Sequence, residues 1–316
     1  MMGILQHFIP RAAMAAALVG VLSLPVSVGA ADRDKMEAAL QKAAEAFRQA
    51  RVEQALEHVR EAIVADPAAP RPHFTAGQIY QSMRESAKAI AAYSRVIELE
   101  PRAVDAFRNR GIEHFRLGHV KESVEDFNRE LKLEPARLAH HWMRGLSFYY
   151  AGQFASGKTQ FEIHKSVNPH DVENAVWHFL CTAKAENIDK ARELYIPIKG
   201  DSRIPMMEVH ALFGGKGTVE DVMKAVESGE PRQLELNNRY FFAHLYLGLY
   251  YDALGDRKKM KEHIDLATGK YAQKHYMGDC ARVHKMMIEG RLSHQGKKSA
   301  AIRKPAKKED GEENAK

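Results

Sequence analysis

The chain has 316 residues, of which 45% are hydrophobic, 28% charged and 8% aromatic, and this excludes a single small core and a protein built from membrane spans. Its formal net charge of +6 makes nucleic-acid binding the first function to test. Two cysteines are too few for a disulfide framework or a cysteine-rich zinc site.

Residues 1–30 have the organisation of a secretory signal peptide. A short polar to basic start precedes an apolar run of 17 residues, Ala12 to Val28, and a small-x-small motif ends at Ala30. We expect cleavage before Ala31 and a periplasmic or secreted protein. An uncleaved N-terminal anchor is the alternative, although the run is close to the shortest that crosses a bilayer. No cysteine follows the run, so the acylation site of a lipoprotein is missing, and no stable membrane insertion is expected after cleavage.

Residues 31–170 repeat with a period of 34. The period is marked by four equally spaced prolines, Pro67, Pro101, Pro135 and Pro169. A small residue lies twelve positions before each proline, at Ala55, Ala89, Ser123 and Gly157. A larger apolar residue lies eight positions before each, at Val59, Tyr93, Phe127 and Phe161, and a glycine lies 24 positions before the last three, at Gly77, Gly111 and Gly145. These positions resemble the tetratricopeptide repeat (TPR).

The spacing has a physical meaning of its own. Each unit is expected to be two amphipathic helices that cross closely at the small residue, with an aromatic wedge between them and a proline after the second helix. One such hairpin cannot bury its apolar face, so neighbours must stack. The fold class predicted is an all-α, right-handed TPR superhelix, an α-solenoid with four units in residues 31–170.

Helical patterns continue through residues 171–290 after the period decays. We expect a fifth helix pair, a helix, glycine turn and helix with Thr218 and Asp221 as a capping box, another TPR-like unit, and a last helix at about 275–289 that caps the array. The stretches ENAVWHFLC, MEVHALFGG and RYFFAHLYLGLYYDALGD make residues 172–287 similar to NlpI-type proteins, TPR lipoproteins of the Gram-negative cell envelope. That resemblance implies an adaptor whose partners are peptidoglycan hydrolases and an envelope protease. This chain departs from the NlpI-type pattern because it lacks the cysteine to which a lipid is attached.

Residues 291–316 form a basic tail that is too polar to fold alone and is expected to be disordered. They carry eight Lys or Arg and four acidic residues, and residues 1–30 carry only Arg11, so the body between them has 38 basic and 37 acidic residues. A nucleic-acid-binding domain needs its positive charge on the folded surface, so we expect no nucleic-acid partner. The tail either keeps the protein in solution or contacts an anionic polymer of the cell envelope.

The common catalytic motifs are absent from the sequence, and the one match to a phosphate-binding motif lies outside its usual structural context. HExxH and GxSxG are absent. GxxxxGK[ST] occurs once, as GQFASGKT at residues 152–159, but it lies within the helical repeat and no strand precedes it, so we expect no enzyme activity, cofactor or metal. The GGKG at residues 214–217 indicates a turn that ends a helix. His178 and Cys181 share a helix face, but two ligands do not make a metal site, and packing within the array is the simpler interpretation. Whether Cys181 and Cys280 form a disulfide is left open, because spacing alone does not determine their distance.

The concave face of the array is the expected binding site. The first helix of each pair should line it, and residues that recur at the same repeat positions should point inward. These candidate groove residues are Phe74, Gln78, Arg108, Asn109, Ile112, Arg116, Trp142, Leu146, Tyr150 and Lys184. Aromatic and arginine side chains dominate binding hot spots, so a peptide or a partner helix is the expected ligand. The alternative is that several of the aromatic residues pack between repeats.

The function predicted is therefore that of a non-catalytic periplasmic TPR adaptor that binds protein or peptide partners in its groove. An assembly or secretion scaffold with other protein partners has the same sequence features. Binding of an anionic envelope polymer through the tail is a further alternative, and self-association into a homodimer is expected if an apolar terminal helix lacks a cover.

Overall fold

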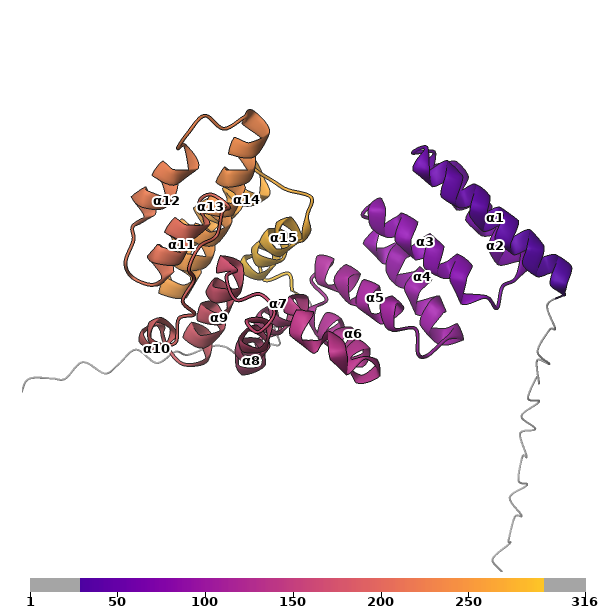
Figure 1. The fold of residues 1–316 in the computed structure, drawn as a ribbon, viewed down its shortest axis with the longest axis horizontal. Helices are drawn as coiled ribbons and strands as arrows, with labels where there is room; N and C mark the ends of the chain where they lie inside the picture. Colours follow the sequence, from indigo (N-terminus) through magenta and orange to yellow (C-terminus); the bar gives the residue numbers. More distant parts are fainter. Residues whose placement is uncertain (1–28, 293–316) are drawn as a thin grey trace, which may run out of the picture.

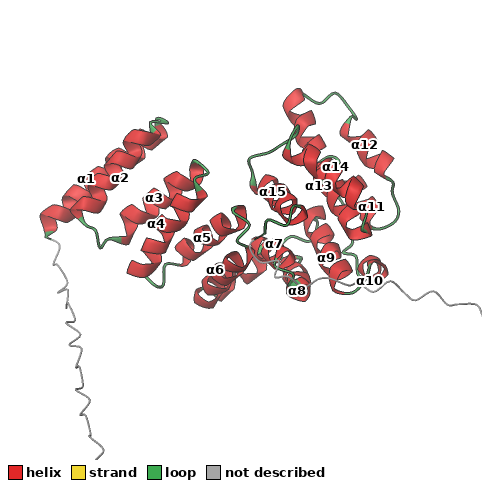
Figure 2. Ribbon diagram, turned by 180° about the vertical axis from the view of Figure 1, so that it is seen from behind, coloured by secondary structure: helices red, strands yellow, loops and turns green. Residues whose placement is uncertain are grey.

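The structure, a computed structural model, describes residues 29–292. The predicted signal peptide, apart from its last two residues, and the basic tail, apart from its first two, lie outside the described residues. Residues 29–292 form fifteen α-helices and one 3₁₀ helix, with no strand, which confirms the all-α solenoid (Figure 2). None of the helices in this range is long and apolar enough to cross a membrane.

Four helix pairs follow the 34-residue period and lie side by side along an arc (Figure 1). They are α1 (Ala30–Arg48) with α2 (Val52–Ala65), α3 (Pro70–Ser82) with α4 (Ser86–Leu99), α5 (Val104–Arg116) with α6 (Val120–Leu133), and α7 (Trp142–Tyr150) with α8 (Phe154–His164). The 3₁₀ helix η1 (Pro135–His140) precedes α7. Each proline of the repeat follows the end of a second helix, where the missing N–H and fixed φ of proline prevent continuation of the helix.

The predicted crossing of small residues and aromatic rings is present in three successive pairs. A Cβ atom added to Gly77 would lie 2.5 Å from the ring of Tyr93, and one added to Gly145 would lie 2.6 Å from the ring of Phe161. Gly111 faces Phe127 in the same way. A side chain at these positions would push the two helices of the pair apart, so the repeat requires glycine there.

The turn inside each pair contains one residue in the left-handed conformation, and these residues are also 34 positions apart. Gly118 and Gly152 have φ values of 74° and 75°. The equivalent residues of the first two pairs are Ala50 and Arg84, with φ values of 57° and 61°. Only glycine adopts this conformation without steric cost, so the first two turns are strained relative to the later two.

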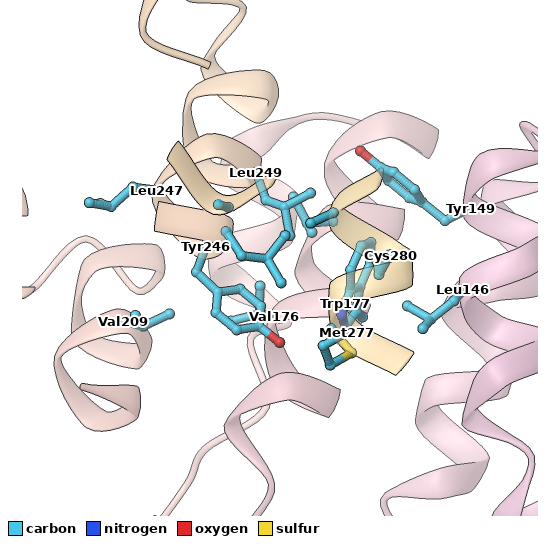
Figure 3. Close-up of a cluster of buried hydrophobic side chains, with 14 of the residues drawn as sticks. Leu146, Tyr149, Val176, Trp177, Val209, Tyr246, Leu247, Leu249, Met277 and Cys280 are labelled. Carbon is cyan, nitrogen blue, oxygen red and sulfur yellow. The ribbon is translucent and has the colours of Figure 1, made fainter. Parts of the chain in front are cut away.

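The second half continues the array with helices of irregular length, from six residues in α10 to 22 in α13. These are α9 (Val172–Ala185), α10 (Ile188–Glu193), α11 (Met206–Phe213), α12 (Val219–Val226), α13 (Gln233–Leu254), α14 (Arg257–Thr268) and α15 (Tyr276–Ile288). The capping box predicted at the start of α12 is formed, because Thr218 and Asp221 each bond the backbone N–H of the other. The largest core of buried side chains lies in this half, around Trp177, Phe213 and Tyr246 (Figure 3).

The last helix lies in a different place from the one expected. We expected this helix to cover the end of the array, but α15 packs against α14 and against α5 and α7 on the inner side of the arc (Figure 1). The packed chain continues past α15, because Leu292, within the predicted tail, is only 5% exposed and belongs to the main core. The second half thus folds back onto the repeats that precede it.

Candidate functional site

The concave face has an open part, which we call the open strip. It consists of Phe74 and Gln78 from α3 and of Arg108, Asn109 and Ile112 from α5. Phe74 and Arg108 occupy the same position in successive repeats, as do Gln78 and Ile112, so the four follow one another across neighbouring helices. Gln78 and Arg108 are exposed, and the other three are partly buried. Five of the ten predicted groove residues are therefore at least partly accessible on these two helices.

A hollow of about 460 Å³ lies at one edge of the open strip. Phe74 and Val96 contribute to its apolar part, and its charged residues are Arg71, Glu100, Arg102 and Asp105. The ring of Phe74 packs edge-on against Tyr93, with ring centroids 5.5 Å apart. An apolar side chain of a ligand can therefore contact Phe74 while polar groups beside it stay in reach of the charged rim.

Helix α15 covers the other part of the concave face. The ring of Tyr276 stacks on Phe115 with ring centroids 5.2 Å apart and meets Trp142 edge-on at 5.0 Å. Tyr150 and Leu146 are 6% and 1% exposed. Trp142, Leu146 and Tyr150, which the sequence analysis assigned to the groove, therefore face a segment of the same chain. The alternative that groove aromatics have a packing role holds for this half.

A buried charge cluster holds α15 in place. Asp279 is 1% exposed and accepts hydrogen bonds from Arg116 at 3.0 Å, from Arg84 and from Arg282. Arg116 also bonds Glu113, which is fully buried and accepts a hydrogen bond from Ser86 at 2.6 Å. Burial raises the pKa of Glu113, and its contacts with Ser86 and Arg116 oppose that rise. Arg116 is thus an internal ion-pair partner rather than a free groove residue.

Lys184, the last predicted groove residue, also has an intramolecular partner. Its Nζ lies 3.1 Å from Asp252 on α13, and the hydroxyl of Tyr149 donates to the same carboxylate at 2.9 Å. This pair ties α9 and α7 to α13. Lys184 is exposed, but its charge is already compensated within the chain.

The two cysteines are buried free thiols, so the disulfide left open by the sequence is not formed. Cys181 packs against Gly157 of α8. Cys280 faces the hydroxyl of Tyr150, which lies 3.3 Å from its sulfur and 3.3 Å from the Nδ1 atom of His284. Burial raises the pKa of both thiols, which keeps them protonated.

A second concave feature, which we call the α9 cavity, lies where α7, α8 and α9 meet the start of α15. It has a volume of about 230 Å³. Its apolar lining consists of Trp142, Leu146, Phe161, Trp177 and Met277, and its polar lining consists of His164, Asn168, Asp171, Glu173 and Asn174. Figure 3 shows Trp177, Leu146 and Met277 near one another at this point. Burial raises the pKa of Glu173 to about 7, against the opposing charge of Arg203.

The histidines are dispersed and mostly structural in their contacts. His178 is 2% exposed and lies 3.3 Å from Glu162, which agrees with its predicted packing role. His244 and His263 lie with their Nδ1 atoms 2.9 Å apart, and burial together with His263 lowers the pKa of His244 to about 4. Within residues 29–292, no group of three or more His, Cys, Asp or Glu side chains is arranged to hold a metal ion.

Neither the α9 cavity nor the partners of α15 are predicted from the sequence. The acidic residue at 279 and the tyrosine at 276 carry no periodic signal, because α15 lies outside the 34-residue repeat. The one available signal was the aromatic content of α7, which exceeds what packing between two repeat units requires. An excess of aromatic residues indicates that another element covers the helix, but it does not identify that element.

Comparison with known proteins agrees with this architecture. Residues 76–146 match the family model of the tetratricopeptide repeat. A UDP-N-acetylglucosamine–peptide N-acetylglucosaminyltransferase of Giardia intestinalis is 34% identical over 64 residues, which are 20% of this chain and 4% of that enzyme. The chain thus spans only a small part of this relative.

Solved structures resemble the chain over a longer range. A tetratricopeptide repeat protein of Parabacteroides merdae matches 82% of this chain and 98% of its own, with 17% identity and a TM-score of 0.54. PilF of Pseudomonas aeruginosa also matches 82% of this chain and 99% of its own, with 15% identity and a TM-score of 0.44. The chain therefore folds as a tetratricopeptide-repeat solenoid, and residues 76–146 carry the sequence pattern of that repeat.

Proposed function

We propose that this protein is a non-catalytic adaptor that binds a segment of a partner protein on the open strip. The observation that carries the proposal is the division of the concave face. Helix α15 covers Trp142, Leu146 and Tyr150 on α7 and Arg116 at the end of α5, whereas Gln78 on α3 and Arg108 on α5 are exposed. A TPR array offers this face to ligands, and here only its N-terminal part is free to receive one.

The open strip has the chemistry of a peptide-binding surface. Arg108, Asn109 and Gln78 supply hydrogen-bond donors, and Arg108 supplies a positive charge. The side chains of Phe74 and Ile112 offer apolar contact surface to a ligand. A segment that crosses α3 and α5 can therefore place an apolar side chain on Phe74 while its carbonyl groups or a carboxylate bond Arg108. At one end of the open strip, α15 blocks the path of such a segment.

We further propose that the protein acts in the periplasm and that its partners are peptidoglycan hydrolases and an envelope protease. The signal-like organisation of residues 1–30 supports export. The similarity of residues 172–287 to NlpI-type proteins supports the class of partner. Cell fractionation followed by N-terminal sequencing tests the location. We expect a periplasmic protein that begins at Ala31, and a cytoplasmic protein with an intact N-terminus would contradict the proposal.

Site-specific photo-crosslinking tests the binding surface. A photoreactive amino acid at Gln78 should crosslink to a partner segment in envelope extract, and that partner should be a hydrolase or a protease. The control position is Lys121, which is exposed on α6, a second helix of its pair. Equal crosslinking at both positions would contradict binding on the open strip.

A charge reversal gives the matching functional test. Arg108→Glu should lower partner affinity about tenfold or more, because it replaces a donor with a repelling charge. Arg60→Glu changes an equally exposed arginine on α2 and should leave the affinity unchanged. Loss of binding in both variants would indicate general electrostatic attraction instead of a defined site.

A further inference from the structure

The α9 cavity contains polar atoms that have no partner within the chain. Asn174 is 3% exposed, and its amide nitrogen donates to the Phe161 carbonyl at 3.1 Å, which leaves its Oδ1 atom unpaired. Trp177 is 2% exposed, and its indole N–H is also unpaired. Both residues line the cavity. A buried polar atom without a partner costs free energy, so the Asn174 acceptor points to a donor that enters from outside the chain, and the Trp177 donor needs a water molecule or another acceptor beside it.

Most of the polar atoms that line the α9 cavity accept hydrogen bonds. One carboxylate oxygen of Glu173 is buried and makes no hydrogen bond of normal geometry, although the Tyr246 hydroxyl lies close enough to lower the pKa of that carboxyl. The Nδ1 atom of His164 lies 2.8 Å from the carbonyl oxygen of Ala139, which can only accept. In the neutral ring Nδ1 therefore carries the proton, and Nε2 is an acceptor. Together with Asn174, these groups favour a ligand that is rich in donors.

The charge around the α9 cavity is negative. Asp171 and Glu173 line it, and Asp201 lies beside Asp171 in an adjoining polar hollow that also contains Arg203. Arg203 forms ion pairs with all three carboxylates. Within residues 29–292 it is the one cation that pairs with any of them, so three acids share a single positive charge. A second cation would be attracted and an anion repelled.

Aromatic rings complete the lining. Trp142, Trp177 and Phe161 come from three different helices and surround the same space. A cation placed against such rings is attracted by their π-electrons, and tryptophan gives the strongest effect. Rings combined with carboxylates form the kind of pocket that holds an ammonium group. A neutral apolar ligand would leave the acceptors unpaired and the excess negative charge uncompensated.

We propose that the α9 cavity binds the ammonium group of a lysine side chain from the partner segment. Lysine has a long apolar stem, which suits the aromatic walls, and three N–H donors with no acceptor, which suit Glu173, Asn174 and His164. Trp142 of the cavity occupies the repeat position that Phe74 and Arg108 occupy in the open strip. The proposal rests on the proposed function, because the lysine belongs to the partner that the open strip binds, in a part of that partner that lies beyond α15.

The chain contains two tryptophans, Trp142 and Trp177, and both line the α9 cavity. The intrinsic tryptophan fluorescence of the full chain therefore reports on this site alone. The probe is N-acetyl-lysine amide, and its neutral control is N-acetyl-norleucine amide, which has the same stem without the ammonium group. We expect a saturable fluorescence change with the lysine probe and an affinity at least about tenfold lower for the norleucine control, equivalent to one lost charge interaction.

Two variants keep the result interpretable. Glu173→Gln should lower the affinity for the lysine probe about tenfold, and Glu235→Gln, a change in an exposed ion pair on α13, should leave it unchanged. Circular dichroism checks that both variants fold. No saturable change with the lysine probe, or the same change with the neutral control, would overturn the proposal and indicate that water fills the cavity.

The small probe also separates this inference from the proposed function. If the probe binds to the wild type and Arg108→Glu does not affect partner capture, the cavity is confirmed and the open strip is not. If partner capture depends on Arg108 and the probe does not bind, the strip is confirmed and the lysine site is rejected. A lysine-to-norleucine change in a captured partner peptide then tests whether the two sites act on one segment.

Discussion

Arg116 on α5 donates its Nε hydrogen to Asp279 on α15 at 3.0 Å, and this bond joins residues 163 positions apart in the chain. Arg84 and Arg282 bond the same carboxylate, so one buried acid links α15 to the second and third repeat units. The consequence is functional, because α15 forms one wall of the concave face. The open strip ends where this cluster begins.

Asp279→Asn should destabilise the protein strongly. The substitution keeps the side-chain shape but removes the charge that three guanidinium groups share, and breaking a buried ion pair on one side costs about 3–5 kcal/mol. Urea unfolding followed by tryptophan fluorescence measures the change, because Trp142 contacts Tyr276 of α15.

Asp265→Asn is the matched control for this cluster. Asp265 on α14 also pairs with α15, through Lys285 at 2.7 Å, but its side chain is 36% exposed. An exposed pair of this kind contributes about 0–1 kcal/mol. Equal losses of stability in the two variants would show that the contribution of the Asp279 cluster to stability does not depend on its burial.

The repeat could be predicted from sequence because its contacts are local and periodic. Gly77 meets Tyr93 within one hairpin, and the same contact recurs 34 residues later. The position of α15 could not be predicted in this way. Arg116 looks the same in the sequence whether it faces a ligand or Asp279, and no periodicity relates α15 to α5. Half of the predicted groove was therefore assigned to a ligand although the chain itself fills it.

The α9 cavity was hidden for a related reason. Its lining comes from the ends of three helices and from Met277 of α15, so it forms only when the second half folds back onto the repeats. Trp142 was identified as a groove residue from its repeat position, but Glu173 and Asn174 have no equivalent in the other units. Residues at the junction between regular and irregular repeats carry no pattern from which a site can be read.

Ala50→Gly should stabilise the protein. Ala50 ends the first turn with a φ of 57°, whereas the equivalent residues of the later turns, Gly118 and Gly152, are glycine. Removing the Cβ atom relieves about 1–2 kcal/mol of steric cost, and the greater freedom of glycine in the unfolded chain offsets about 0.4–1 kcal/mol of that gain. We expect a net gain of about 0.5–1 kcal/mol in the free energy of unfolding.

The control for this turn is Ala91→Gly, in the interior of α4 and equally exposed. Glycine there should cost about 1 kcal/mol, because the native conformation is helical. Opposite signs for the two alanine-to-glycine changes, measured by thermal or urea unfolding, are the expected outcome. A loss of stability in both would show that the Ala50 turn is not strained.

Cys181 and Cys280 should be unreactive in the folded protein and reactive after unfolding. Both are fully buried, and burial raises the pKa of each thiol, so little thiolate forms at neutral pH. A thiol reagent such as Ellman's reagent should detect almost no thiol in buffer and two per chain in denaturant, without added reductant. Absence of free thiols in denaturant would show that the purified protein contains a disulfide, contrary to the structure.

Glu173 should make stability fall as the pH rises, in contrast to an ordinary salt-bridged acid. Burial raises its folded-state pKa to about 7 from an ordinary value of 4.5, so between these values the folded protein binds more protons than the unfolded chain. Stability from this group is therefore complete below pH 4.5 and is lost as the pH rises through 7. The charged groups that face it are Asp171, which precedes α9, and Asp201 and Arg203 in the loop that precedes α11, and the neutral titratable groups are Tyr246 on α13 and His164 on α8.

Glu173→Gln isolates this contribution, because the other groups titrate in both proteins. We expect the variant to gain about 1–3 kcal/mol relative to the wild type between pH 4.5 and pH 8, measured by urea unfolding at several pH values. A bound lysine would favour the ionised form, so the wild type should also bind N-acetyl-lysine amide more tightly at pH 8 than at pH 6. A stability difference that stays constant with pH would show that Glu173 is ionised throughout, with Arg203 outweighing the effect of burial.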